Sequence, residues 1–343
     1  MELDHITDFI KAARAKEASD VHIIAGAPAL FRIGKDLVPA TQTMLTPEVT
    51  RRLAFELLSD NQQEMFRQRL DFDLMAADEA GRYRVNISYN DGAVGAVIRI
   101  LPELPRTLEE LHMPPVVHYL TSQTKGMVLI TGSTSQGKTT TMSAMINEIN
   151  TNHRKHIVTI EDPIETVHLN KKSIVRQREV GRDTQTFASG LRAALRQDPD
   201  VIAIGEMRDY ETIRIALTAA ETGVLVLSTL HVISIDKVIE RLLSYAPVED
   251  EGHVRYLLAG ALQGIIHQEL LPCISGGKRV ALEVLMATDA AKNVLRNRGV
   301  YFLRNIIATG GRFGMIPMGQ SVEALLAEGA ITPEVASAVM VNY

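Results

Sequence analysis

Two different spacings of apolar residues run through the first seventy residues. Between residues 4 and 18 they recur at helical spacing, and residues 21–24 and 30–38 read as short strands punctuated by glycine and proline. A capping threonine followed by proline predicts a helix over residues 47–58, and a second helix is expected over residues 60–69. This part of the chain therefore mixes helices with short strands.

A strict alternation of apolar and polar residues follows. Apolar positions between Tyr83 and Tyr89 alternate with polar ones, and Asn90-Asp91-Gly92 offers a turn into a second strand over residues 93–100. The pattern predicts an antiparallel hairpin with one polar face. Together with the preceding elements, it indicates a small α+β domain over residues 1–100.

The pattern changes after a proline-rich, acidic segment. Residues 101–115 contain four prolines and are expected to link two domains. Beyond them, short and continuously apolar strands alternate with helical segments, as in a parallel sheet covered on both faces. These strands are predicted over residues 127–131, 157–160, 201–205 and 224–227. After residue 272 the pattern is mixed, with helices expected over residues 289–298 and 322–328.

Composition narrows the class of protein. The chain has 343 residues, 46% of them hydrophobic, with 36 basic and 41 acidic side chains and a formal net charge of −5. A single cysteine, Cys273, excludes an internal disulfide and a cysteine-rich zinc site. No signal peptide or apolar run of the roughly 18 residues needed to span a membrane is found. We therefore expect a soluble, cytoplasmic protein without membrane insertion, and the acidic balance disfavours nucleic acid as a partner.

The segment GSTSQGKT satisfies the phosphate-loop pattern GxxxxGK[ST], and it stands between a predicted strand and a predicted helix. In such a loop, backbone N–H groups surround phosphates, the lysine meets the β and γ oxygens, and the following hydroxyl reaches Mg²⁺. A glycine turn with a solvated lysine is the weaker alternative. The predicted nucleotide-binding residues are Gly132, Ser133, Thr134, Ser135, Gln136, Gly137, Lys138, Thr139 and Thr140.

Polar residues also follow the other predicted strands. Glu161 and Glu165 come after one strand, Glu206 after the next, and His231 after the third. The carboxyl ends of parallel strands share one edge of a sheet, which is where ligands bind. Asp200 precedes its strand, so Glu206 is the acid expected at Mg²⁺. Taken singly, each acid reads as a surface or cap residue and His231 as a satisfied polar residue; beside a phosphate loop they become candidates for catalysis.

With these residues in place, the chain resembles the secretion ATPase superfamily, and most closely its type IV pilus retraction, or twitching motility, ATPases. The resemblance covers nearly the whole chain in several long blocks that keep one order. The blocks are ASDVHI at residues 18–23, the phosphate loop, TIEDPIE at 159–165, QREVGRDT at 177–184, LRAALRQDPDVIAIGEMRD at 191–209, ALTAAETG at 216–223 and STLH at 228–231.

The resemblance implies a PAS-like N-terminal domain, a RecA-like ATPase domain and a homohexamer. It implies that Lys138 and Thr139 bind phosphate and Mg²⁺, that Glu206 is the acid of the second nucleotide motif, and that Glu165 polarises the attacking water. It places His231 in the histidine box. The spacing of residues alone leaves Glu161 and Glu165 open for the role at water.

Arginines from the N-terminal domain complete the site in this family, and we expect Arg84 and Arg99 to do so because a guanidinium suits spread phosphate charge. Two blocks depart from the family pattern. Ser228 and Val232 replace the ends of GTLHT, and residues 290–297 read AAKNVLRN where retraction enzymes carry an AIRNLIRE-like segment.

Together with the nucleotide-site residues, the resemblance therefore implies an ATP-hydrolysing, Mg²⁺-dependent hexameric motor that retracts type IV pili, working with an inner-membrane pilus platform protein at the inner face of the cytoplasmic membrane. The expected domains are a PAS-like domain (1–100), a linker (101–115), a RecA-like core (116–272) and a mostly helical C-terminal part (273–343). A RecA-like motor that translocates nucleic acid, and an accessory pilus ATPase of low activity that regulates a partner motor, are the alternatives.

Overall fold

The computed structural model describes residues 4–101, 104–297 and 299–341. The chain divides into two compact units, residues 1–103 and 104–343, and each is described by itself. Residues 102–103 of the expected linker, residue 298 at the end of a predicted helix, and both chain ends lie outside the described residues. Among the described residues, no helix combines the length and apolar character needed to cross a bilayer.

The N-terminal unit is a six-stranded antiparallel sheet with three helices. Its strand order is β3-β2-β1-β6-β5-β4. Its core joins Phe9 and Ile10 of the first helix to Val85 and Ile87 of the central hairpin. The elements are α1 (Ile6–Ala15), β1 (Asp20–Ile23), β2 (Leu30–Ile33), β3 (Asp36–Pro39), α2 (Pro47–Phe55), α3 (Asp60–Arg69), β4 (Asp71–Asp78), β5 (Gly81–Asn90) and β6 (Ala93–Ile100).

Two features of this unit differ from the sequence-based expectation. The strand expected over residues 30–38 is a hairpin, because the backbone turns at Gly34 with φ of +62°. Strand β4 was not predicted. Its acidic residues blur the alternation of apolar and polar positions, and it is half-buried or exposed along its whole length.

The second unit is built on a seven-stranded sheet of order β13-β12-β7-β11-β10-β8-β9. Strands β12 through β9 in this order are parallel, and β13 joins β12 antiparallel. Its strands are β7 (Gly126–Thr131), β8 (His156–Glu161), β9 (Ile174–Glu179), β10 (Val201–Ile204), β11 (Leu225–Leu230), β12 (Leu262–Pro272) and β13 (Lys278–Met286). Its α-helices are α4 (Pro115–Thr121), α5 (Lys138–Asn152), α6 (Phe187–Ala194), α7 (Tyr210–Thr222), α8 (Ile235–Leu243), α9 (Glu251–Ala261), α10 (Asp289–Arg296), α11 (Leu303–Thr309), α12 (Met318–Ala327) and α13 (Pro333–Met340).

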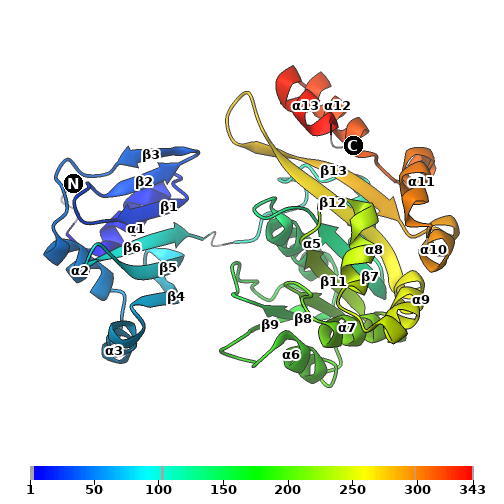
Figure 1. The fold of residues 1–343 in the computed structure, drawn as a ribbon, viewed down its shortest axis with the longest axis horizontal. Coiled ribbons are helices and arrows are strands. Elements are labelled where there is room, and N and C mark those ends of the chain that lie inside the picture. The colour runs from blue at the N-terminus through cyan, green and yellow to red at the C-terminus, as the bar shows by residue number, and fades with distance from the viewer. Residues whose placement is uncertain (1–3, 102–103, 298, 342–343) are drawn as a thin grey trace. The chain divides into compact units, whose positions relative to one another are not determined.

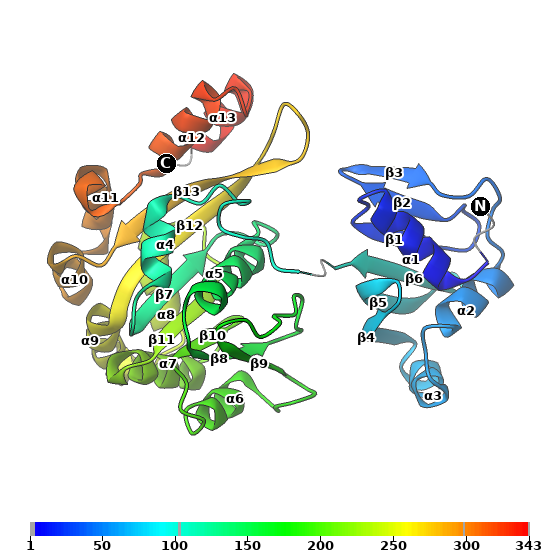
Figure 2. The same ribbon diagram turned by 180° about the vertical axis from the view of Figure 1, so that it is seen from behind.

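Helices cover both faces of this sheet. Helices α4 and α5 lie over the face turned to the viewer in Figure 2, and α8 lies over the face seen in Figure 1. Strands β7 and β11 are buried along their entire length, and their apolar runs over residues 127–131 and 224–227 predict burial of these parts. Because Ile204 pairs with Ile160 on one side and with Ser228 on the other, the carboxyl ends of three strands meet at one edge.

Residues 104–114 belong to this unit rather than to a free linker. Leu108 and Met113 are buried in its core. Thr107 and Glu110 exchange hydrogen bonds of 2.9 and 3.1 Å that close a turn. Strand β9 and the β12–β13 hairpin were not predicted, because glutamine, glutamate and arginine interrupt their apolar runs. Figure 1 shows the tip of this hairpin extending past the neighbouring strands.

Candidate functional site

The phosphate loop joins the end of β7 to the start of α5, as its sequence predicts. Gly137 caps the helix with φ of +79°, a left-handed conformation that favours glycine. Gly132 has φ of +150°, and a Cβ atom there would lie 2.6 Å from the backbone oxygen of Gln268. Both glycines are therefore required by the backbone, one for its conformation and the other for close approach to β12.

Lys138 is held against the loop. Its side chain is only 5% exposed, and Nζ donates a hydrogen bond of 2.6 Å to the carbonyl oxygen of Ser133. Burial lowers the pKa of Lys138, and the nearby charge of Glu206 works in the opposite direction. The lysine thus lies in the field of the acid expected at the nucleotide.

His231, which follows β11, lies between this lysine and Glu206. Its Nδ1 is 3.2 Å from Lys138 Nζ, and its Nε2 is 3.8 Å from an oxygen of Glu206. Burial and the charge of Lys138 lower the pKa of His231, so the ring is neutral at pH 7. Because an ammonium only donates, Nδ1 accepts and the proton sits on Nε2, on the side of the carboxylate. The structure therefore brings together three of the predicted residues.

Glu206 also has a partner that sequence reasoning missed. The guanidinium of Arg208, two residues further along, forms an ion pair with its carboxylate. Glu206 is largely buried while Arg208 is exposed, and this pairing raises the pKa of Arg208. The only sequence signal was a basic residue two positions after the acid. Because Arg208 is exposed, its guanidinium can hold the Glu206 carboxylate or move away and leave that carboxylate to another cation.

The structure separates the two glutamates that spacing left open. Glu161 ends β8, is buried, and accepts hydrogen bonds from Thr159 Oγ1 at 2.5 Å and Gln177 Nε2 at 3.0 Å. Glu165 is half-buried, and its carboxylate makes no hydrogen bond or ion pair within the described ranges 4–101, 104–297 and 299–341. Glu161 is thus occupied in the fold, whereas Glu165 is free to act on another molecule.

Asp200 has a structural role. At the opposite end of the strands, it accepts hydrogen bonds of 2.9 Å from the backbone N–H of His156 and from Lys155 Nζ. Strand β11, however, continues to Leu230 rather than ending at residue 227. The serine and threonine of the STLH block are therefore buried strand residues, and only His231 emerges at the edge.

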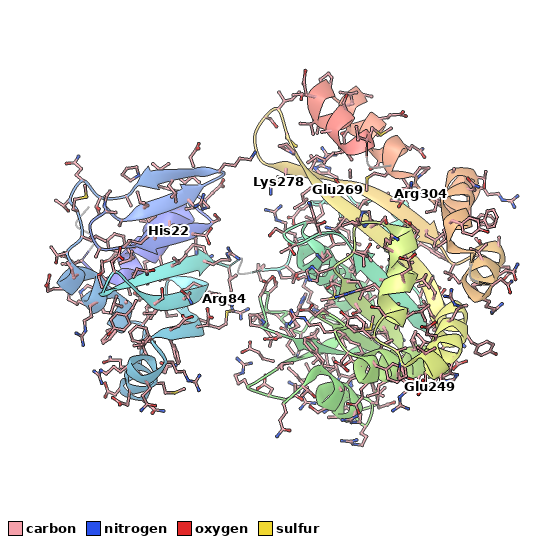
Figure 3. The ribbon with its side chains drawn as sticks, in the orientation of Figure 1. His22, Arg84, Glu249, Glu269, Lys278 and Arg304 are labelled. Carbon is pink, nitrogen blue, oxygen red and sulfur yellow. The ribbon has the colours of Figure 1, made fainter. Side chains whose placement is uncertain are left out.

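Arg84 and Arg99 lie in the N-terminal unit, where they face each other across β5 and β6. Arg99 Nε is 3.1 Å from Asp20 Oδ1, and Arg84 is 3.7 Å from Asp73. Both arginine side chains are exposed, and Figure 3 labels Arg84. Like charges directly opposite each other are unfavourable in a sheet, so the pair offers an incoming anion two guanidinium groups on one face.

A buried polar row runs away from the phosphate loop across the sheet. Thr131 Oγ1, at the end of β7, is 3.0 Å from His267 Nδ1 on β12, and His267 stands opposite Glu283 on β13. Burial, with help from the charge of Lys138, lowers the pKa of His267 to about 4. Burial raises the pKa of Glu283 to about 7, against the charge of Arg304. Two titratable groups with opposite shifts thus share one face.

This row predicts opposite pH effects for two substitutions. Between pH 6.5 and 4.5 the unfolded chain protonates His267 while the folded chain does not, so this group destabilises the fold on acidification. Glu283 protonates in the folded chain first, so it stabilises the fold over the same range. In the Glu283→Gln variant, the free energy of unfolding should fall on acidification by about 1.4 kcal/mol per pH unit more than in the parent protein. In the His267→Gln variant it should fall by about 1.4 kcal/mol per pH unit less. Urea unfolding at pH 6.5, 5.5 and 4.5 measures how the free energy of unfolding changes with pH. The double variant should restore the pH dependence of the parent. The same pH dependence in all four proteins would contradict the pKa shifts assigned to His267 and Glu283.

Comparison with known proteins places this arrangement in a family. The sequence model for the family described as "Type II/IV secretion system protein" matches residues 3–321. The chain belongs to this family. Within it, the chain is 41% identical to "Type IV pilus retractation ATPase PilT" of Pseudomonas aeruginosa, covering 96% of both chains. It is 38% identical to "Twitching motility protein" of Neisseria gonorrhoeae, covering 96% of this chain and 89% of that one.

A solved structure is also similar over nearly the whole chain. The crystal structure of the pilus retraction motor PilT with bound ADP matches with a TM-score of 0.87 and 41% identity, covering 97% of this chain and 96% of that one. The resemblance inferred from the sequence blocks is therefore confirmed. So is the predicted α/β fold class, an N-terminal α+β domain followed by an ATPase domain with a mainly parallel sheet.

Proposed function

We propose that this chain is a motor ATPase that hydrolyses ATP to drive type IV pilus retraction. The observation that carries the proposal is the 41% identity to a pilus retraction ATPase over 96% of both chains. This similarity includes both compact units, so it extends well beyond the phosphate loop that many unrelated ATPases share.

In this proposal the phosphate loop binds ATP, with Lys138 against the β and γ phosphates. The hydroxyl of Thr139 and the carboxylate of Glu206 are oxygen donors of the kind that Mg²⁺ prefers, and these two residues would hold the ion. Mg²⁺, when bound, neutralises charge that develops on the phosphates. The observed ion pair with Arg208 holds the Glu206 carboxylate in place until then.

Glu165 is the proposed group that orients the attacking water. Its carboxylate is free of partners in the described part of the chain, as a group that must accept a proton from water requires. His231 is proposed to report the γ-phosphate. A phosphate that draws Lys138 away from His231 Nδ1 would change the partner of that nitrogen, and the ring also neighbours Glu206.

The proposed working form is a homohexamer at the inner face of the cytoplasmic membrane, engaged with a platform protein of the pilus machinery. Arg84 and Arg99 are proposed to complete the nucleotide site of the same or an adjacent subunit. Their cross-strand pairing gives two donors for the spread charge of a transferring phosphoryl group.

Mixing inactive subunits tests the arginine assignment. Arg99→Ala subunits keep Lys138, and Lys138→Ala subunits keep Arg99. If Arg99 acts on a neighbour, a one-to-one mixture should recover up to about a quarter of the parent turnover, because one interface in four pairs an intact lysine with an intact arginine. Phosphate release by each variant and by the mixture is the measurement. A mixture no more active than its components would remove Arg99 from a role in trans.

Loss of the gene in a piliated cell tests the function itself. Retraction predicts an excess of surface pili and lost twitching, restored by the parent gene but not by one encoding Lys138→Ala. Cells without pili would indicate assembly instead. Normal motility together with a purified protein of negligible turnover would favour the accessory role, and turnover stimulated by DNA and lost with added salt would favour a nucleic-acid motor.

A further inference from the structure

Strand β12 continues beyond the end of its neighbour and runs alongside the phosphate loop. Strand β7 ends at Thr131, opposite His267, whereas β12 continues from Gln268 to Pro272 and pairs there with β13. Figure 3 labels Glu269 within this stretch and Lys278 at the start of β13. The edge of β12 that β7 leaves unpaired therefore faces the loop.

Two hydrogen bonds and one close contact join this stretch to the loop. Gln268 Nε2 donates to the backbone carbonyl of Gln136, and Gln136 Oε1 accepts the backbone N–H of Leu270 at 2.6 Å. The backbone of Gly132 approaches the carbonyl of Gln268 so closely that no Cβ would fit. Both ends of the loop, at Gly132 and at Gln136, are therefore held by β12.

Packing alone does not account for a glutamine at this position. The Gln268 side chain is 1% exposed, and its Oε1 has no hydrogen-bond partner among the residues that the structure describes. Burying an amide with one end unsatisfied is unfavourable, and an apolar side chain of the same size would avoid that cost. The feature that distinguishes glutamine here is the bond from its NH₂ group to Gln136.

That bond fixes one peptide group of the loop. A trans peptide is planar, and its carbonyl and N–H point in opposite directions. Anchoring the Gln136 carbonyl on β12 therefore turns the Gly137 N–H away from β12, and within the described residues this N–H has no acceptor. Unpaired N–H groups at the start of a helix are the donors that bind phosphate.

We propose that Gln268 is a positioning residue for nucleotide binding, which aims the Gly137 N–H at a phosphate by holding the Gln136 carbonyl. The inference rests on the proposed function, since it assumes that the loop binds ATP and ADP. Gln268 acts on the phosphates through the loop backbone.

The test compares Gln268→Met with Gln263→Met. Methionine keeps the size of glutamine and removes the donor. Gln263 lies on the same strand and makes the same kind of bond, from Nε2 to the Lys125 carbonyl at 3.1 Å, but at the end of β12 away from the loop. Calorimetric titration with ADP should give a Kd about tenfold weaker for Gln268→Met and within about twofold of the parent for Gln263→Met.

Turnover provides a second readout that a purely structural role would not produce. Loss of one contact to bound phosphate raises KM with little change in kcat, whereas partial unfolding lowers kcat in proportion to the inactive fraction. A Gln268→Met protein with the parent's ADP affinity and KM would overturn the proposal. A parent protein that neither binds ADP nor hydrolyses ATP would instead overturn the proposed function, so the two failures are distinguishable.

Discussion

Replacement of Lys138 by alanine is expected to lower ATP turnover by about a thousandfold or more, because it removes the positive charge that meets the transferring phosphate. Lys138 is nearly buried and held by one backbone carbonyl, Ser133 O, and by His231. Burial already lowers its pKa, so its charge is weakly compensated and is available to a phosphate. A charge in such a site interacts more strongly than one in water.

Phosphate release by purified parent and variant proteins measures this effect. Lys155→Ala is a suitable control, because it removes another partly buried lysine, which forms an ion pair with Asp200 at 2.9 Å at the opposite end of the strands. It should retain turnover within about twofold of the parent. The melting temperature of Lys138→Ala should not fall, since the substitution removes a buried charge rather than a packed apolar group. Turnover above one tenth of the parent would contradict the role of Lys138.

Local signals in the sequence were sufficient for the elements that surround the loop. Continuous apolar runs predicted β7, β8, β10 and β11, and the carboxyl-edge rule placed Glu206 and His231 beside Lys138. These inferences succeed because each depends on a few neighbouring residues and on the shared direction of parallel strands.

Contacts between distant segments could not be predicted in the same way. Gln268 and Gln136 are 132 positions apart, and nothing in either local pattern indicates that they meet. The hydrogen bond from Gln177 to Glu161 likewise depends on the register of β8 with β9, a strand that the sequence did not reveal. The spacing of residues alone therefore could not decide the choice between the two nearby glutamates.

That choice leads to the second large expected effect, on Glu165. Glu165→Gln should lower kcat by about a hundredfold to a thousandfold, because the amide keeps the size of the side chain but cannot take a proton from water. Glu165 makes no bond to other described residues, so its replacement should leave the melting temperature and the affinity for ATP close to those of the parent.

Glu161→Gln is the matched comparison, and it should behave in the opposite way. Its carboxylate accepts charge-assisted hydrogen bonds from Thr159 and Gln177, and these weaken when the charge is removed. The melting temperature should therefore fall, by roughly the cost of weakening two buried hydrogen bonds. The kcat should stay within a few fold of the parent value. Single-turnover phosphate release together with thermal unfolding of both variants separates the cases. If Glu161→Gln abolished turnover at an unchanged melting temperature and Glu165→Gln remained active, the water-activating role would move to Glu161, and its observed bonds would then be those that orient a catalytic base.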